Sequence, residues 1–161
     1  MTQMKFLVSD TQSERHKTIR SFLKEDTAVI AVLLSAVDLE WTLRRAIIAL
    51  GRSPTSELRA KRISSLQNKS GTGYWNVWKA EVASKTSVEL NELIGDWDEL
   101  KKAYELRHKL IHGTQGTTGR SYASAKVERI LEASRKVCEF AKEHGRDLYG
   151  RMPVRRKIAA R

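Results

Sequence analysis

Apolar residues recur along most of the chain at spacings of three and four, which is the pattern of helices that bury one face. This spacing predicts helices over residues 10–24, 26–50, 53–66, 74–84, 86–112 and 121–144. Glycines that can end a helix follow three of these stretches, at Gly51, Gly113 and Gly145. No strand-rich stretch appears. The predicted fold is therefore all-α, a bundle of five or six helices in up-and-down order.

Several predicted helices begin at residues that commonly cap a helix N-terminus. Asp10 or Thr11 precedes the first helix, and Ser53 precedes the third. Thr86 stands three residues before Glu89, the spacing of a capping box. This box predicts one long helix that starts near residue 86 and continues without a break to residue 112.

The predicted helix over residues 26–50 has the widest apolar face and should be central to the fold. A carboxylate, Glu40, falls in the middle of its inward positions, which are Val29, Leu33, Ala36, Glu40, Leu43, Ile47 and Leu50. A buried carboxylate needs a partner, because losing water without one is costly. Glu40 either forms a structural salt bridge, reaches the surface, or holds Arg107 in place.

Arg107 lies on the inward face of the predicted helix over residues 86–112, together with Leu90, Leu93, Ile94, Trp97, Leu100, Tyr104 and Ile111. Its charge cannot be discharged, so it needs either a carboxylate such as Glu40 or a bound phosphate. His112 follows five residues later, ~140° around a regular helix and ~7.5 Å along it. The two side chains therefore meet only if the last turn before Gly113 is irregular. His108, four residues before His112, shares its face.

The six residues from Arg107 to His112, RHKLIH, resemble the R-x4-6-H motif of HEPN domains. As a pattern of helices the resemblance extends over residues 12–144. It implies a HEPN-like helical bundle with a metal-independent endoribonuclease site, catalytic residues Arg107 and His112, and supporting residues His108, Glu40 and Tyr104. It also implies a homodimer in which each protomer lends its Arg and His. A toxin or defence effector, with an antitoxin protein as partner, is one role for such an enzyme.

The chemistry of these two side chains fits RNA cleavage without a metal or other cofactor. The 2′-OH of the substrate is the nucleophile, so the protein need only move protons and stabilise negative charge. The dipole of the helix favours the protonated form of a histidine in its last turn, which suits an acid for the leaving 5′-oxygen. A base is then missing from a single chain.

The net charge of +11 indicates a polyanionic partner. RNA, DNA and anionic lipid all qualify, but no stretch approaches the ~18 apolar residues of a membrane span, so nucleic acid is favoured. The length suits one domain over residues 1–145, followed by a basic arm over residues 146–161. The predicted phosphate contacts are Lys109, Arg151, Arg155, Arg156 and Lys157.

The arm has three open interpretations. It contains six basic residues against Asp147 and a helix-breaking Pro153, which favours an extended or mobile segment. Its charges are either solvated or bound to nucleic acid. Alternatively, the arm packs on the bundle through Leu148, Tyr149 and Ile158.

Other sequence features carry less functional information. The start of the chain lacks the apolar region of a signal peptide, and the single Cys138 cannot form an internal disulfide, so a cytoplasmic location is expected. No ligand spacing for a metal is evident. The loop over residues 68–73 is rich in glycine but lacks the ending of a P-loop. The aromatic residues Tyr74, Trp75 and Trp78 suit a core better than base stacking.

Two alternative functions remain at this point. The chain is also compatible with a non-catalytic HEPN-like module that binds nucleic acid or a protein, in which Arg107 and His112 only secure the helix end. The second alternative is an all-α transcriptional regulator resembling the mannitol-operon repressor family, although no recognition helix for DNA is evident.

Overall fold

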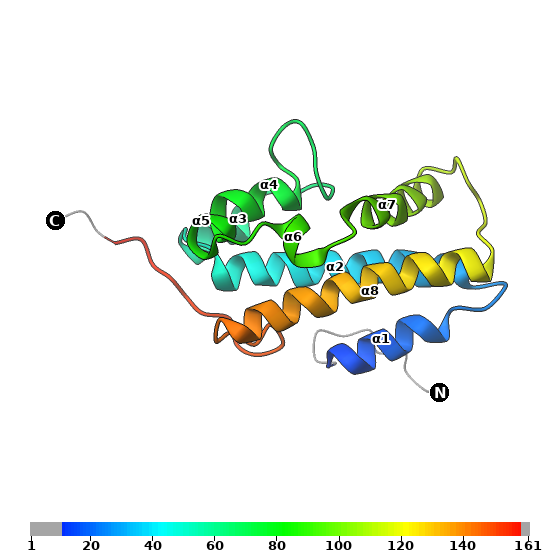
Figure 1. Cartoon of the computed structure of the whole chain (residues 1–161), viewed down its shortest axis with the longest axis horizontal. Coiled ribbons are helices and arrows are strands. Elements are labelled where there is room, and N and C mark those ends of the chain that lie inside the picture. The colour runs from blue at the N-terminus through cyan, green and yellow to red at the C-terminus, as the bar shows by residue number, and fades with distance from the viewer. Residues whose placement is uncertain (1–10, 159–161) are drawn as a thin grey trace. The chain divides into compact units, whose positions relative to one another are not determined.

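The computed structural model describes residues 11–158, and these residues form helices with no strand among them (Figure 1). The predicted all-α class is confirmed. The helices are α1 (Gln12–Ser21), α2 (Ala28–Leu50), α3 (Thr55–Ala60), α4 (Tyr74–Trp78), a π-helical turn (Lys79–Ala83), α5 (Ser84–Thr86), α6 (Leu90–Ile94), α7 (Trp97–Ile111) and α8 (Arg120–Glu143).

The described residues group into two compact units, and each unit combines two separate stretches of the chain. The first unit contains residues up to 40 and residues 98–135. The second unit contains residues 41–97 and residues from 136 onward. The long helices α2 and α8 therefore contribute one part to each unit.

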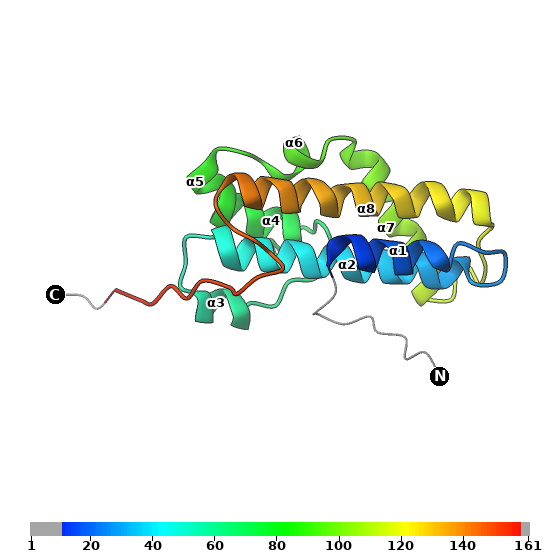
Figure 2. The same ribbon diagram turned by 90° about the horizontal axis from the view of Figure 1, so that it is seen from below.

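The first unit has a core built from α1, the start of α2, α7 and the start of α8, and Figure 2 shows α1 lying along the start of α2. Its fully buried members are mostly small or branched, and they comprise Ile19, Ala28, Ala31, Val32, Leu106, Ala123, Val127 and Leu131. Thr11 caps α1 through a capping box with Glu14, which satisfies two backbone N–H groups at the helix start. The predicted cap at Thr11 is thus confirmed, and its alternative Asp10 lies outside the described residues.

The second unit is closed by aromatic packing and by the segment after α8. Trp78 is fully buried, with its ring centroid 5.7 Å from that of Phe140, and Tyr74 is also buried. These two aromatic residues belong to the core, as expected, and so does Cys138. Leu148 after α8 is 1% exposed.

The segment after α8 is held by hydrogen bonds and is not the free arm that its composition predicted. Arg45 on α2 donates hydrogen bonds to the carbonyls of Leu148 and Gly150. Tyr149 packs on Trp41, with ring centroids 5.0 Å apart. Buried apolar contacts and satisfied carbonyls therefore offset the ordering entropy of this stretch. The packing interpretation is correct for Leu148 and Tyr149, whereas Ile158 is 93% exposed.

Two predicted helices differ from the observed ones. The third ends at Ala60 instead of residue 66, and its N-cap is Pro54. The hydroxyl of Ser53, the predicted cap, donates instead to Glu81 at 2.8 Å. The predicted helix over residues 86–112 is broken at Gly95, which has a φ of 65°, and only α6 and α7 on either side are helical.

The beginning and end of that predicted helix also require correction. The capping box before α6 is formed by Glu89 and Glu92, while the hydroxyl of Thr86 donates to the carbonyl of Val82. Ile111, predicted to face inward, is 48% exposed. The buried face of α7 consists of Leu100, Ala103 and Leu106.

Candidate functional site

Arg107 on α7 lies opposite Glu40 on α2 within the first unit. Nη2 of Arg107 is 3.7 Å from Oε1 of Glu40, and the two side chains are 31% and 29% exposed. Partial burial raises the pKa of the Glu40 carboxyl, and the nearby Arg107 charge opposes this rise. The structure thus pairs the two residues that the sequence identified, at the edge of the core.

Tyr104 fixes α7 against α2 one turn before Arg107. Its hydroxyl donates a hydrogen bond to the carbonyl of Ala36 at 3.3 Å. Ala36 lies one turn before Glu40 on α2, so this contact positions the two helices where the ion pair forms. Tyr104 therefore helps to hold α7 against α2 beside the ion pair.

His108 and His112 lie together on the exposed side of α7. Their ring centroids are 4.2 Å apart, which confirms the predicted shared face. The backbone N–H of His112 donates to the carbonyl of His108 at 3.0 Å, the regular pattern of an α-helix. Gly113, with a φ of 70°, then ends the helical path.

The regular last turn separates Arg107 from His112 around the helix. The irregularity that would bring the two side chains together is not observed, and five residues of regular helix place them about 140° apart. Arg107 faces α2, and His112 is exposed on the side of His108. One copy of the chain therefore presents the two groups in different directions.

The residues predicted to contact phosphate divide between the two units. Lys109 on α7 is in the first unit and forms an ion pair of 2.9 Å with Glu105. This contact raises the pKa of Lys109. Arg151, Arg156 and Lys157 are exposed in the second unit. Arg155 in that unit is half-buried and donates hydrogen bonds to the backbone carbonyls of Ile48, Ala49 and Ser53.

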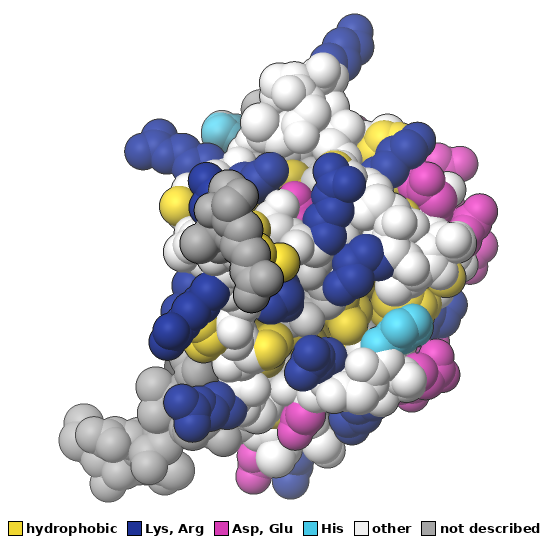
Figure 3. Space-filling model, turned by 90° about the vertical axis from the view of Figure 1, so that its left-hand side faces the viewer, with side chains coloured by type: hydrophobic (Ala, Val, Ile, Leu, Met, Phe, Trp, Pro, Cys, Tyr) yellow, Lys and Arg dark blue, Asp and Glu magenta, His cyan; other side chains and the backbone are white. Residues whose placement is uncertain are grey.

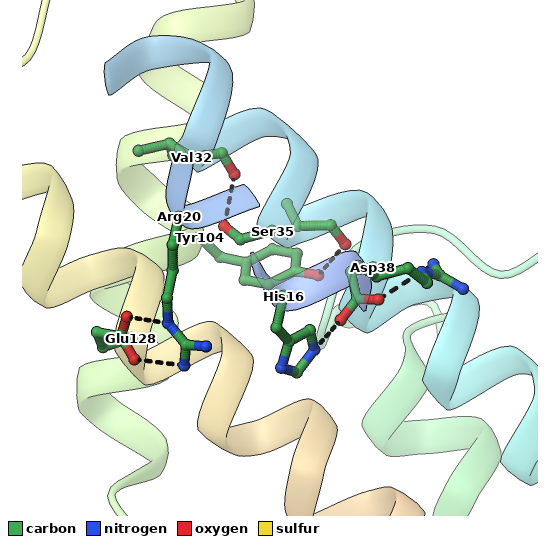
Figure 4. Close-up of polar contacts among 9 residues, drawn as sticks. His16, Arg20, Val32, Ser35, Asp38, Tyr104 and Glu128 are labelled. Carbon is green, nitrogen blue, oxygen red and sulfur yellow. Dashed lines mark hydrogen bonds and ion pairs between the residues drawn. The ribbon is translucent and has the colours of Figure 1, made fainter. Parts of the chain in front are cut away.

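A buried charge cluster of the first unit was not anticipated from the sequence (Figure 4). Asp38 on α2 is fully buried, and its carboxylate contacts Arg15 at 3.1 Å and His16 at 2.9 Å. Both partners lie on α1 and are less than one-tenth exposed. The cluster is shielded from solvent, so it joins α1 to α2 and offers no surface for a substrate.

A sequence signal for this cluster exists in α2. Ser35, Asp38 and Thr42 are spaced by three and four residues on a largely apolar helix, and all three are fully buried. Polar residues that follow the helical period mark a face that meets hydrogen-bonding groups. The basic residues Arg15 and His16, close to the apolar Ile19, are the matching signal on α1.

Within residues 11–158, no group of three His, Cys, Asp or Glu side chains is arranged to hold a metal ion. None of the described helices has the length and apolar character needed to cross a membrane. Comparisons of the chain with models of protein families, with curated proteins and with solved structures found no match.

Proposed function

We propose that the chain is a HEPN-type, metal-independent endoribonuclease that acts as a homodimer. The observation that supports this proposal best is the partly exposed guanidinium of Arg107 on α7, which pairs with Glu40 of α2. The end of α7 also presents two exposed histidines, His108 and His112. The order of these residues along α7 is that of the motif from Arg107 to His112. The fold class is also the one that the resemblance implies.

Arg107 is suited to stabilise the negative charge that develops on the phosphate. At 3.7 Å, its contact with Glu40 is an ion pair longer than a hydrogen bond, so N–H donors of the guanidinium are available to phosphate oxygens. Glu40 keeps the side chain at this position. Because the carboxyl is partly buried, it favours one fixed cation over mobile solvent ions.

His112 is suited to move protons. In the proposed reaction the 2′-oxygen attacks the adjacent phosphorus, the bond from phosphorus to the 5′-oxygen breaks, and the 5′-oxygen takes a proton from one imidazolium. A second imidazole accepts the proton of the 2′-OH. Two copies of His112, one from each protomer, supply the acid and the base. The exposed position of His112 leaves it accessible to a second chain.

Exposed apolar side chains support the homodimer. Ile30 and Val37 on α2 are 41% and 49% exposed, and a spacing of seven residues puts them on one face. Ile111 on α7 is 48% exposed and lies one turn after Arg107. Val37 lies one turn before Glu40, so apolar surface adjoins the ion pair on both helices. A second copy that covers this surface would bring its own Arg107 and His112 to the same site.

The test is incubation of the protein with labelled RNA in EDTA. Arg107→Ala and His112→Ala should each abolish cleavage while the helical circular dichroism and the melting temperature stay close to wild type. The matched controls are Arg20→Ala and His108→Ala, which should retain most of the activity. Cleavage that survives in His112→Ala but not in His108→Ala would show that the proton carrier is misassigned.

Binding of RNA without cleavage by the wild type would favour a non-catalytic nucleic-acid-binding module. The dimer is tested separately by light scattering on the wild type and on Val37→Asp. This substitution should separate the protomers and remove cleavage together. A monomeric protein that still cleaves RNA would contradict the composite site.

A further inference from the structure

The second unit has a basic face where the segment after α8 crosses the end of α2, and Figure 3 shows Lys and Arg side chains gathered on this side of the molecule. A hollow of about 560 Å³ is lined by four cations, Arg52, Arg155, Arg156 and Lys157. A second hollow of about 230 Å³ is lined by Lys85, His144, Arg146 and again Arg155. Arg155 is thus common to both hollows.

Arg155 is the residue that fixes this surface. Its guanidinium donates to the carbonyls of Ile48 at 2.6 Å, Ala49 at 3.1 Å and Ser53 at 3.2 Å. Its own carbonyl accepts a hydrogen bond from the backbone N–H of Thr55 at 3.1 Å. These bonds hold the segment on both sides of Arg155 against the end of α2. The backbone that carries the neighbouring Arg156 is thereby held at this end of α2.

The cations around Arg155 are exposed and close to one another. Arg52, Arg146 and Arg156 are all exposed to solvent. Partial burial lowers the pKa of Arg155, the nearby charge of Arg146 lowers it further, and the charge of Glu81 opposes both effects. Glu81 is itself bound to the backbone N–H and the hydroxyl of Ser53. Like charges held together repel, and an anion bound between them relieves the repulsion.

The lining of the hollows indicates which part of a nucleic acid they fit. Apart from the imidazole of His144, the lining residues carry no aromatic ring on which a base could stack. The cations are suited to phosphate, and they lie on two sides of Arg155, so that successive phosphates of one strand could meet each hollow in turn.

We propose that this face binds the phosphate backbone of single-stranded nucleic acid, independently of sequence, through the cations of the two hollows. The choice of RNA as the natural strand rests on the proposed ribonuclease function. The site contains neither Arg107 nor His112. It therefore contributes affinity for the strand and no chemistry.

The test uses oligodeoxythymidylate, which has no 2′-OH and so cannot be cleaved by the proposed reaction. Its affinity is measured at several salt concentrations for the wild type and for the triple variant Arg52→Gln, Arg146→Gln, Arg156→Gln. The matched control carries Lys17→Gln, Lys24→Gln and Lys69→Gln, which remove the same charge from exposed residues that line neither hollow. Circular dichroism and a melt establish that each variant is folded.

The triple variant should flatten the slope of log K against log salt by roughly 2, about 0.7 for each lost phosphate contact on a single strand. Taking equal affinities for the two proteins at 1 M salt, this difference in slope means that the triple variant binds about fiftyfold more weakly than the wild type at 0.15 M salt. The control should lose much less. A heteropolymeric oligonucleotide should bind as well as oligodeoxythymidylate.

Equal losses in the triple variant and the control would overturn the proposal, because the net charge alone would then explain binding. Binding to vesicles of anionic phospholipid, with none to the oligonucleotide, would also overturn it. Failure of RNA cleavage in the wild type would refute the proposed ribonuclease but leave this binding measurement intact.

Discussion

Replacing Asp38 with asparagine would test what holds α1 in place. The substitution keeps the shape of the side chain but removes the only charge on it. In the wild type, the carboxylate contacts Arg15 at 3.1 Å and His16 at 2.9 Å, and its side chain is 0% exposed. The Arg15 side chain is 4% exposed. Asparagine would therefore leave a guanidinium in the interior without the anion that offsets its lost hydration.

The expected cost is large because breaking a buried ion pair from one side destabilises a protein by about 3–5 kcal/mol. For a chain of this length, such a loss lowers the melting temperature by roughly 6–20 °C. Urea unfolding followed by circular dichroism measures the free energy directly. The control is Glu128→Gln, which breaks the ion pair of 2.7 Å between Arg20 and Glu128, whose side chains are 48% and 47% exposed. Exposed pairs contribute about 0–1 kcal/mol, so this variant should unfold close to wild type.

A second variant separates the charge from the packing. Arg15→Met combined with Asp38→Leu removes both ions and fills the space with apolar groups, which is commonly neutral or stabilising by about 1–4 kcal/mol. The buried His16 also loses its hydrogen bond to Asp38, which costs about 1–3 kcal/mol. The double variant should therefore be more stable than Asp38→Asn. If Asp38→Asn costs no more than Glu128→Gln, the cluster does not anchor α1 and the reasoning from its burial is wrong.

Three further predictions concern single residues. Burial raises the pKa of the Glu40 carboxyl, so the folded state holds the carboxyl proton more tightly than the unfolded chain does. The wild type should therefore match Glu40→Gln in stability at pH 4 and become less stable than Glu40→Gln as the pH rises above 4.5, the ordinary pKa of a glutamate. A stability difference that does not change with pH would contradict this prediction. Gly51→Ala would place a methyl group 2.5 Å from a carbonyl oxygen of the preceding turn and 2.8 Å from Leu58, so the free energy of unfolding in urea should fall by about 1–3 kcal/mol. The control Gly116→Ala adds a methyl group that meets no atom within 4 Å, so its free energy of unfolding should change little. Leu148→Ala should cost about 2–5 kcal/mol because the side chain is 1% exposed, and an unchanged melt would show that the segment after α8 does not stabilise the second unit.

The sequence was a good guide to features that depend on neighbouring residues in a helix. The long helices, the cap at Thr11 and the face shared by His108 and His112 all follow from helical periodicity and local hydrogen bonding. The partnership of Glu40 and Arg107 was also accessible, since each charge occupied an inward position that required an opposite charge. Local rules were sufficient in these cases.

Features that depend on residues far apart in the chain were missed. The helix predicted to run over residues 86–112 is broken at Gly95, although the apolar spacing continues through the break. Arg155 was predicted only as a phosphate contact, because nothing near it in the sequence indicates its hydrogen bonds to the carbonyls at the end of α2. The charge cluster at Asp38 was missed for the same reason, since the partners of Asp38 lie on another helix.

The division of the chain into two interleaved units has a consequence for its synthesis. Each unit needs a part of α2 and a part of α8, and the bond from Arg155 to Ile48 spans 107 positions. Neither unit can therefore close on the ribosome until most of the chain has emerged. During this interval α2, whose composition is strongly apolar, has only α1 to cover it, and only along its first part. The nascent protein should depend on chaperones that shield this helix, and its folding should be slow relative to bundles whose neighbouring helices pack in order.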